Sequence, residues 1–448
     1  MSGRSASSSD RAGRSGRPTA TPRPASRAYK TVAAAPAASR ARGGTVVARA
    51  AAGQWDYPLL AILAMLLAFG LVMVFSATYY RAGVYYFQRQ LGWVVAGLVI
   101  MVIFARLPLD WWPKLAIPLM ITALISLAAV YLFGDERFGS RRTFFGSIQP
   151  SEFAKLAVVV YVSAWVASKG RQLADVRGGL IPFAILMGLV ASLIMIEPNL
   201  STALVVLTIG CVIFFVGGAD IKQLMAVVAI GAVMFVLVLW QSPYALERIT
   251  GWWNMLSDPS MAPENVRRAI ELMRRRDGLL PDASVWNQKL SVALLWSDFL
   301  FANIGADLGP VGQLAVVALY AAVGYRGLGI ALGAADRFST LLALGVTTWI
   351  LTQASIHIGT SLALIPATGQ ALPFMSYGGS AMVSSLAGIG LLLAVARGKA
   401  EKRTSDEDLV VGGRDGRTRV PDPGRGGRAE AGRRPAEPAG GTRRGTRR

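Results

Sequence analysis

Histidine and cysteine are almost absent from this 448-residue chain, which holds one of each, His357 and Cys211. A single cysteine excludes a disulfide or a cysteine-based metal site within one chain. A single histidine excludes a multi-histidine metal site and argues against a Ser-His-Asp triad. His357 lies in an apolar segment, where a lone histidine is more often a hydrogen-bonded structural residue than a catalyst.

Charged residues are also scarce, at 16% of the chain, where a soluble protein carries about 25%. Apolar runs of about 20 residues, the length that crosses a bilayer, recur instead through its middle. We therefore predict an all-α polytopic transmembrane bundle of about ten helices, with a large extracellular loop at about 242–304 between the seventh and eighth. The expected spans are roughly residues 57–77, 88–105, 112–133, 151–168, 178–197, 199–217, 222–241, 305–325, 339–361 and 377–396.

Most of the net charge of +20 lies at the two ends of the chain. Residues 1–55 hold ten Lys/Arg and one acid, and residues 397–448 hold fifteen and eight. Both segments are rich in Gly, Pro, Ser and Arg and are expected to be disordered tails around a membrane domain at 56–396. Basic tails favour the cytoplasmic side and contact with anionic membrane lipids. No basic motif interleaved with aromatics indicates nucleic acid binding.

Ionisable groups in or beside a span are costly, so they are functional candidates. Arg141 and Arg142 precede the sequence Gln149–Lys155, in which Glu152 and Lys155 are three residues apart and share one helix face. Such a pair could line a polar cavity, or it could be an ion pair that neutralises itself at a helix start.

Two further polar positions flank spans. Glu197-Pro198-Asn199 forms a sharp turn, which would serve as a capping turn or contribute to a site. Asp298 lies at the mouth of an apolar segment, where desolvation should raise its pKa towards a value useful for a general base. The alternative role for Asp298 is a helix N-cap.

Two segments outside the spans carry their own signals. Residues 366–380 are rich in Pro and Gly, and irregular backbone at membrane depth survives only where it is buried or lines a cavity. Residues 263–278 predict an amphipathic helix with Val266, Ile270 and Met273 on one face. That helix would lie on the outer leaflet, or its arginines would form a basic lip for an anionic substrate.

Taken in order, these motifs resemble the FtsW/RodA (SEDS) family of peptidoglycan glycosyltransferases over roughly residues 56–396. The resemblance rests on the ordered set rather than on any one motif. The matching segments are Gln149–Lys155, Pro243-Tyr244 with Glu247–Thr250, Asp258-Pro259, Ser297–Ala302, Gly305–Gly309 and Leu372–Ser380.

The resemblance implies ten transmembrane helices in the bacterial cytoplasmic membrane. The even number of spans and the basic tails predict that both termini are cytoplasmic. It also implies polymerisation of lipid II into glycan strands, with inversion and with undecaprenyl diphosphate as leaving group. Asp298 matches the family's essential aspartate, the proposed general base. The residues expected to bind substrate are Arg141, Arg142, Glu152, Lys155, Asn199, Arg248, Ser376 and Tyr377.

The resemblance further implies a class B penicillin-binding protein as partner, along with other proteins of the division or elongation complex. The long tails favour the division type. A divalent cation, Mg²⁺ or Mn²⁺, would suit the diphosphate, although its ligands cannot be identified from the sequence, and no organic cofactor is expected.

Three features depart from the family pattern. The chain has Asn199 and Ser201 in a turn where the family usually has an acid, Trp296-Ser297 before Asp298, and a divergent loop at 258–296. Two other functions therefore stay open. One is a transporter or flippase of a lipid-linked precursor, and the other is a non-catalytic scaffold for a transpeptidase.

Overall fold

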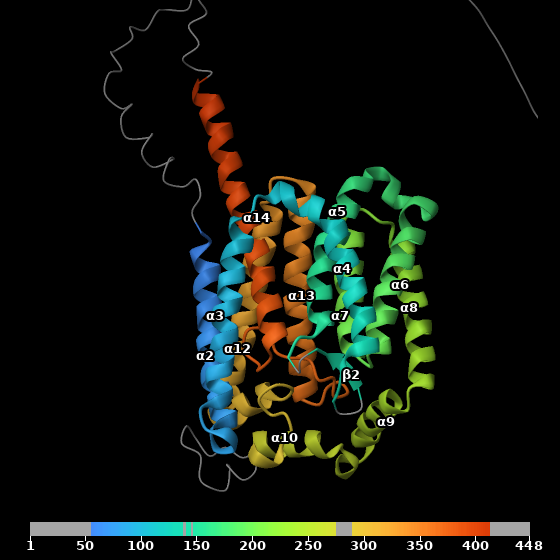
Figure 1. Ribbon diagram of the computed structural model, residues 1–448, viewed down its shortest axis with the longest axis vertical. Coiled ribbons are helices and arrows are strands. Elements are labelled where there is room, and N and C mark those ends of the chain that lie inside the picture. The colour runs from blue at the N-terminus through green and yellow to red at the C-terminus, as the bar shows by residue number, and fades with distance from the viewer. Residues whose placement is uncertain (1–54, 138–139, 145–146, 275–288, 413–448) are drawn as a thin grey trace, which may run out of the picture. The chain divides into compact units, whose positions relative to one another are not determined.

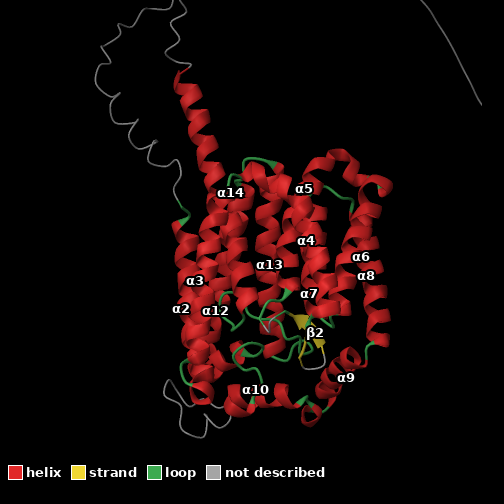
Figure 2. Ribbon diagram, in the orientation of Figure 1, coloured by secondary structure: helices red, strands yellow, loops and turns green. Residues whose placement is uncertain are grey.

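A computed structural model describes residues 55–137, 140–144, 147–274 and 289–412, all within one of the chain's two units, Val47–Arg448. Helices make up nearly all of this part, and they run side by side as a bundle (Figure 2). Nine of the described helices are long and apolar enough to cross a membrane, and α7 is a shorter apolar helix. The ten are α2 (Tyr57–Ala82), α3 (Tyr85–Arg106), α4 (Trp112–Phe133), α5 (Pro150–Lys169), α6 (Ile181–Ile196), α7 (Leu200–Val216), α8 (Ile221–Gln241), α12 (Leu300–Leu332), α13 (Arg337–Ser361) and α14 (Gly379–Gly412).

Local sequence explains where these helices begin. The Asp56 carboxylate accepts a hydrogen bond from the Leu59 amide at 3.0 Å, and Pro58 occupies the first turn of α2. Asp336 caps α13 in the same way through the Ser339 amide. Helix α12 is kinked at Gly309, whose φ of +63° is followed by Pro310. The predicted transmembrane helices are thus all present, with boundaries shifted by a few residues.

The helices differ in how deeply they are buried. α14 is the most enclosed, followed by α5 and α13, and α8 is the least. α13 contacts α5, α7, α12 and α14, while α14 packs along α3. Glu152 and Lys155 of α5 and Gln353 of α13 are buried and therefore face protein rather than lipid, which is where intramembrane polar groups are tolerated.

The first helix begins and the last helix ends at the same end of the bundle, and the loop with α9 and α10 lies at the opposite end (Figure 1). This agrees with an even number of spans. A short antiparallel hairpin of β1 (Asp135–Arg137) and β2 (Ser140–Thr143) also lies at the loop end and is a small addition to the all-α fold. Helix α14 continues to Gly412 into the range expected as a disordered tail, because Ala, Glu, Lys and Arg favour helix there. Residues 1–54 and 413–448 lie outside the described part.

The large loop contains α9 (Pro243–Ser257), a 3-10 turn at Pro259–Met261 and α10 (Glu264–Arg274). The expected amphipathic helix is present as α10, but its placement on the outer leaflet is wrong. Its residues Val266, Ala269 and Leu272 are buried in a second hydrophobic cluster. That cluster also takes residues from the 292–306 segment and from α9, so α10 covers protein instead of lipid.

Candidate functional site

The segment 362–378, between α13 and α14, has no helix or strand and connects most of the predicted site residues. The prediction that this backbone is irregular is confirmed, and the segment is packed among helices. Its backbone or side chains bond to α3, α7, α9, α13 and the residues before α12. We call residues 362–378 the site loop.

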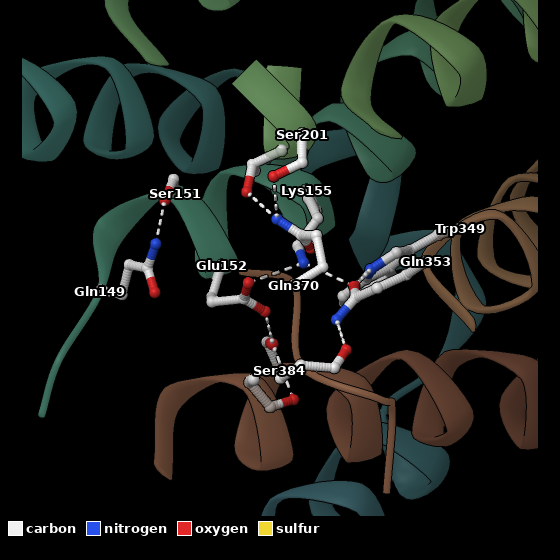
Figure 3. Close-up of polar contacts among 12 residues, drawn as sticks. Gln149, Ser151, Glu152, Lys155, Ser201, Trp349, Gln353, Gln370 and Ser384 are labelled. Carbon is white, nitrogen blue, oxygen red and sulfur yellow. Dashed lines mark hydrogen bonds and ion pairs between the residues drawn. The ribbon is translucent and has the colours of Figure 1, made fainter. Parts of the chain in front are cut away.

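Beneath the site loop, Glu152 and Lys155 form a buried ion pair on α5, with Lys155 Nζ 2.8 Å from Glu152 Oε1. Lys155 Nζ also donates to Gln353 Oε1 at 2.6 Å, and Trp349 Nε1 donates to the same oxygen at 2.9 Å. Ser384 Oγ donates to the second Glu152 oxygen at 3.3 Å. The pair therefore belongs to a network across α5, α13 and α14 (Figure 3).

Gln353 joins this network to the site loop. Its Nε2 donates to the Ala371 carbonyl at 2.9 Å while its Oε1 accepts from Lys155. A neutral side chain thus ties a buried cation to irregular backbone, which limits how far either can move. Sequence reasoning based on ionisable residues missed Gln353, although an amide inside an apolar span was a visible signal.

The turn between α6 and α7 meets the other side of the site loop. Asn199 caps α7 by accepting from the Thr202 amide at 3.3 Å, and its Nδ2 donates to Ser151 Oγ on α5 at 3.3 Å. The expected capping role is confirmed. Gln370 Nε2 donates to Ser201 Oγ at 3.1 Å and to Thr202 Oγ1 at 2.7 Å (Figure 3). Ser201 therefore binds the site loop through both Gln370 and the Thr368 carbonyl.

His357 has the structural role expected from the sequence. It is fully buried, its Nδ1 lies 2.7 Å from the Gln370 carbonyl and its Nε2 accepts from the Phe301 amide at 3.4 Å. Because Nε2 accepts, Nδ1 carries the proton and donates to Gln370. The imidazole thus links α13, the site loop and the first turn of α12.

Asp298 lies directly before α12 and beside the site loop. Its Oδ1 accepts from Ser297 Oγ at 2.9 Å, and a Cβ added to Gly369 would lie 3.4 Å from its Oδ2. The N-cap of α12 is Phe299, and this cap makes no side-chain hydrogen bond. The alternative in which Asp298 caps the helix is therefore wrong, and the half-buried carboxylate faces the site loop.

Ser376 and Tyr377 hold the Asp298 segment against the site loop. Ser376 Oγ donates to the Ser297 carbonyl at 2.7 Å, and the Tyr377 amide donates to the Trp296 carbonyl at 3.0 Å. The Tyr377 ring packs edge-on against Tyr86, with centroids 5.2 Å apart. Burial raises the pKa of the Tyr377 phenol, while nearby Arg89 acts to lower it. Ser376 thus has an evident positioning contact to the candidate base.

Arg248 reaches the site loop from α9, where its Nη1 donates to the Ala367 carbonyl at 3.0 Å. It lines a mostly apolar cavity of about 250 Å³ between α7, α8, α9 and α13. Asp298 and Lys155 are not among the residues that line this cavity, so the Asp298 carboxylate lies outside it. The residues that line it are Pro198, Leu200, Ser201, Leu204, Phe235, Arg248, Ile249, Ile356, Ile365, Pro366, Ala367 and Thr368.

The remaining predicted residues are Arg141 and Arg142. Their backbone belongs to β2, where Arg141 pairs with Glu136, and their side chains lie outside the described part. No group of three His, Cys, Asp or Glu side chains gathers among the described residues as a resident metal ion would need. These residues do not fit a resident metal site, and no step below passes through one.

Two relatives match most of the chain. Stage V sporulation protein E of Bacillus subtilis is 32% identical over 365 residues, covering 76% of this chain and 97% of that protein. A protein of Thioalkalivibrio sulfidiphilus named probable peptidoglycan glycosyltransferase FtsW is 33% identical over 374 residues, covering 79% and 92%.

Solved structures of similar proteins also match most of the chain. A chain from work on the structural coordination of polymerization and crosslinking by a peptidoglycan synthase complex has a TM-score of 0.65 and 27% identity, covering 77% of this chain and 98% of that one. The rod shape determining protein RodA of Thermus thermophilus has a TM-score of 0.56 and 26% identity, covering 77% and 97%. The model of the cell cycle protein family FtsW/RodA/SpoVE matches residues 57–401. The chain therefore belongs to the FtsW/RodA/SpoVE family.

Proposed function

We propose that this multi-pass bacterial membrane protein is a peptidoglycan glycosyltransferase that polymerises lipid II, and that Asp298 is its general base. The observation that carries the proposal is the placement of Asp298. This carboxylate lies directly before α12 and beside Gly369 of the site loop. Relatives named peptidoglycan glycosyltransferase FtsW support the reaction class.

In the proposed reaction, Asp298 takes the proton from the 4-hydroxyl of the acceptor sugar. The hydroxyl oxygen bonds to the anomeric carbon of the donor, and the bond to the diphosphate oxygen breaks with inversion. Undecaprenyl diphosphate leaves with the electron pair of that bond. Ser297 Oγ and the Ser376–Ser297 hydrogen bond keep the carboxylate and its backbone in place for this transfer.

The neighbouring cations fit an anionic leaving group. Arg248 lies at the wall of the apolar cavity, so a diphosphate near its guanidinium would leave space for part of an isoprenoid tail among apolar side chains. The backbone of Arg141 and Arg142 belongs to β2, which contacts α4 and α5. Glu152 and Lys155 are buried in hydrogen bonds with each other and with α13, so their contribution is to hold the floor of the site.

We also propose cytoplasmic termini and a class B penicillin-binding protein as partner. The structural match to a chain of a complex that coordinates polymerization and crosslinking supports such a partner. Cytoplasmic termini would place Asp298 on the outer face of the membrane, where a transpeptidase acts. The basic ends of the chain support this orientation.

The test is polymerisation of labelled lipid II by the purified protein with its partner, comparing wild type with Asp298→Asn. Glycan strands are expected from wild type, with a loss of at least about 100-fold in the variant, as for removal of a general base. Asp110→Asn, an exposed carboxylate in the turn between α3 and α4, is the matched control and should keep full activity.

Two outcomes would contradict the proposal. Strands from Asp298→Asn at the wild-type rate would remove Asp298 from the chemistry. No strands from folded, partner-bound wild type, accompanied by movement of the labelled lipid between leaflets in vesicles, would identify a transporter instead. No strands and no movement would favour a scaffold.

A further inference from the structure

A second buried ion pair lies outside the candidate site, between Lys289 and Asp307. Lys289 belongs to the segment that leads to Asp298, and Asp307 lies on the first part of α12, before its kink. Ser76 of α2 completes the group, because its Oγ donates to Asp307 Oδ2 at 2.5 Å and accepts from Lys289 Nζ at 2.9 Å. The group therefore joins three parts of the chain.

Asn303 extends this group along α12. Its Nδ2 donates to Asp307 Oδ2 at 3.2 Å and lies 3.4 Å from the Met73 carbonyl of α2. Both charged residues are buried, with 3% of Lys289 and 9% of Asp307 exposed. Burial lowers the pKa of the Lys289 ammonium, and Asp307 opposes that effect. Each charge therefore depends on the other for its stability.

The ion pair joins the two ends of the segment 289–307, which contains the candidate base Asp298. Lys289 and Asp307 are 18 residues apart, and Asp298 lies midway between them. Between Lys289 and Asp298 the backbone runs largely in turns, with Leu294 at a φ of +56°. Helix continues only as far as Ser291, and residues 292–299 form neither a helix nor a sheet ladder, so their position depends on a few anchors.

Hydrophobic anchors are present, since Val292 and Leu295 are fully buried in the second cluster. Apolar contacts are not directional, however, and allow a side chain to slide or repack. A buried ion pair is directional, because withdrawing the ammonium would leave the Asp307 carboxylate buried without its counter-charge. The pair thus opposes any shift of the segment along α2 and α12.

We propose that the Lys289–Asp307 ion pair is a positioning device that fixes where Asp298 lies relative to the site loop. This inference rests on the proposed function, in which Asp298 is the base. Lys289 and Asp307 touch no reacting atom and act only through the backbone between them. The effect is therefore expected on the rate of the chemical step rather than on substrate affinity.

The experiment compares charge-removing and charge-keeping variants of the full-length protein with its partner. Lys289→Met and Asp307→Asn remove one charge each, whereas Lys289→Arg and Asp307→Glu keep it. We expect the charge-removing variants to lose kcat by roughly 100-fold with KM within about 3-fold, the size of effect typical of an ångström-scale misplacement. The charge-keeping variants should recover at least about 10-fold of that loss.

Hydrogen exchange supplies a readout that does not depend on activity. Peptides covering residues 292–299 should exchange faster in Lys289→Met and Asp307→Asn than in wild type, while peptides from α5 and α13 stay unchanged. Asp110→Asn, which removes an exposed carboxylate in the turn between α3 and α4, is the matched control and should change neither quantity.

The outcomes separate this inference from the proposed function. An inactive wild type would contradict the proposed function. The hydrogen exchange of residues 292–299 would then still decide whether the ion pair holds this segment in place. An active wild type with charge-removing variants that keep wild-type kcat and exchange would overturn the positioning role. Equal acceleration of exchange over the whole bundle in these variants would also overturn it, by showing a general loss of stability.

Discussion

Gln353 accepts a hydrogen bond from the buried Lys155 ammonium at 2.6 Å, and the same amide holds the site loop through the Ala371 carbonyl. Replacing it with leucine removes an acceptor from a buried cation and a donor from a buried carbonyl. We expect Gln353→Leu to lower the free energy of unfolding by about 1–3 kcal/mol. Thermal unfolding in nanodiscs measures this loss, and Gln88→Leu on the exposed face of α3 should leave the midpoint unchanged.

The Glu152–Lys155 pair should behave as a buried rather than a surface ion pair. Lys155→Met leaves the Glu152 carboxylate buried without its ammonium and is expected to cost about 3–5 kcal/mol. The double variant Glu152→Gln/Lys155→Met should regain much of that loss. A double-mutant cycle by chemical unfolding measures the coupling. The exposed Glu264–Arg267 pair gives the comparison and should show much weaker coupling. Equal coupling in the two pairs would contradict the burial of Lys155.

Close packing of α2 against the site loop predicts opposite effects for two glycine substitutions. A Cβ at Gly70 would lie 2.5 Å from Met375 Cα, so Gly70→Ala must displace backbone and should destabilise by about 1–3 kcal/mol. A Cβ at Gly92 of α3 meets nothing within 4 Å, so Gly92→Ala should stabilise the helix by roughly 0.5–1 kcal/mol. The measurement is the unfolding midpoint of each variant, and a shift of the same sign for both would argue against this packing.

Arg248 should affect activity through geometry as well as charge. Arg248→Gln removes a charged hydrogen bond to Ala367, an interaction of about 1.5–3 kcal/mol, so kcat/KM should fall about 10–100-fold. Arg248→Lys should recover only part of this loss, because an ammonium lacks the planar fork of donors. Initial rates on labelled lipid II test this prediction. Full recovery with lysine would mean that charge alone matters.

The sequence predicted the helices well because long apolar runs depend on composition alone. The site loop was predicted for a similar reason, since Pro366, Gly369 and Pro373 exclude a continuous helix. The placement of α10 was wrong because an amphipathic face has the same pattern whether it meets lipid or protein. Burial of Val266 and Leu272 depends on what packs above them, which local periodicity does not encode.

The polar contacts around the candidate site were only partly predictable. Glu152 and Lys155 are three residues apart, so helix geometry alone brings them together. Lys289 and Asp307 meet only because the chain between them turns back, and Gln353 meets Lys155 from another helix. Such pairs depend on tertiary packing, for which spacing in one sequence carries no signal.

The hydrogen bonds of the site loop join parts of the chain that are synthesised at very different times. Gln90 on α3 donates to the Ser376 carbonyl 286 residues later, and Ser201 on α7 donates to Thr368 167 residues later. These side chains enter the membrane long before the ribosome has made their partners. The end of the young bundle that carries these side chains must therefore stay hydrated, or be shielded by an insertase, until α13 and α14 arrive. The candidate site would be the last part of the protein to mature.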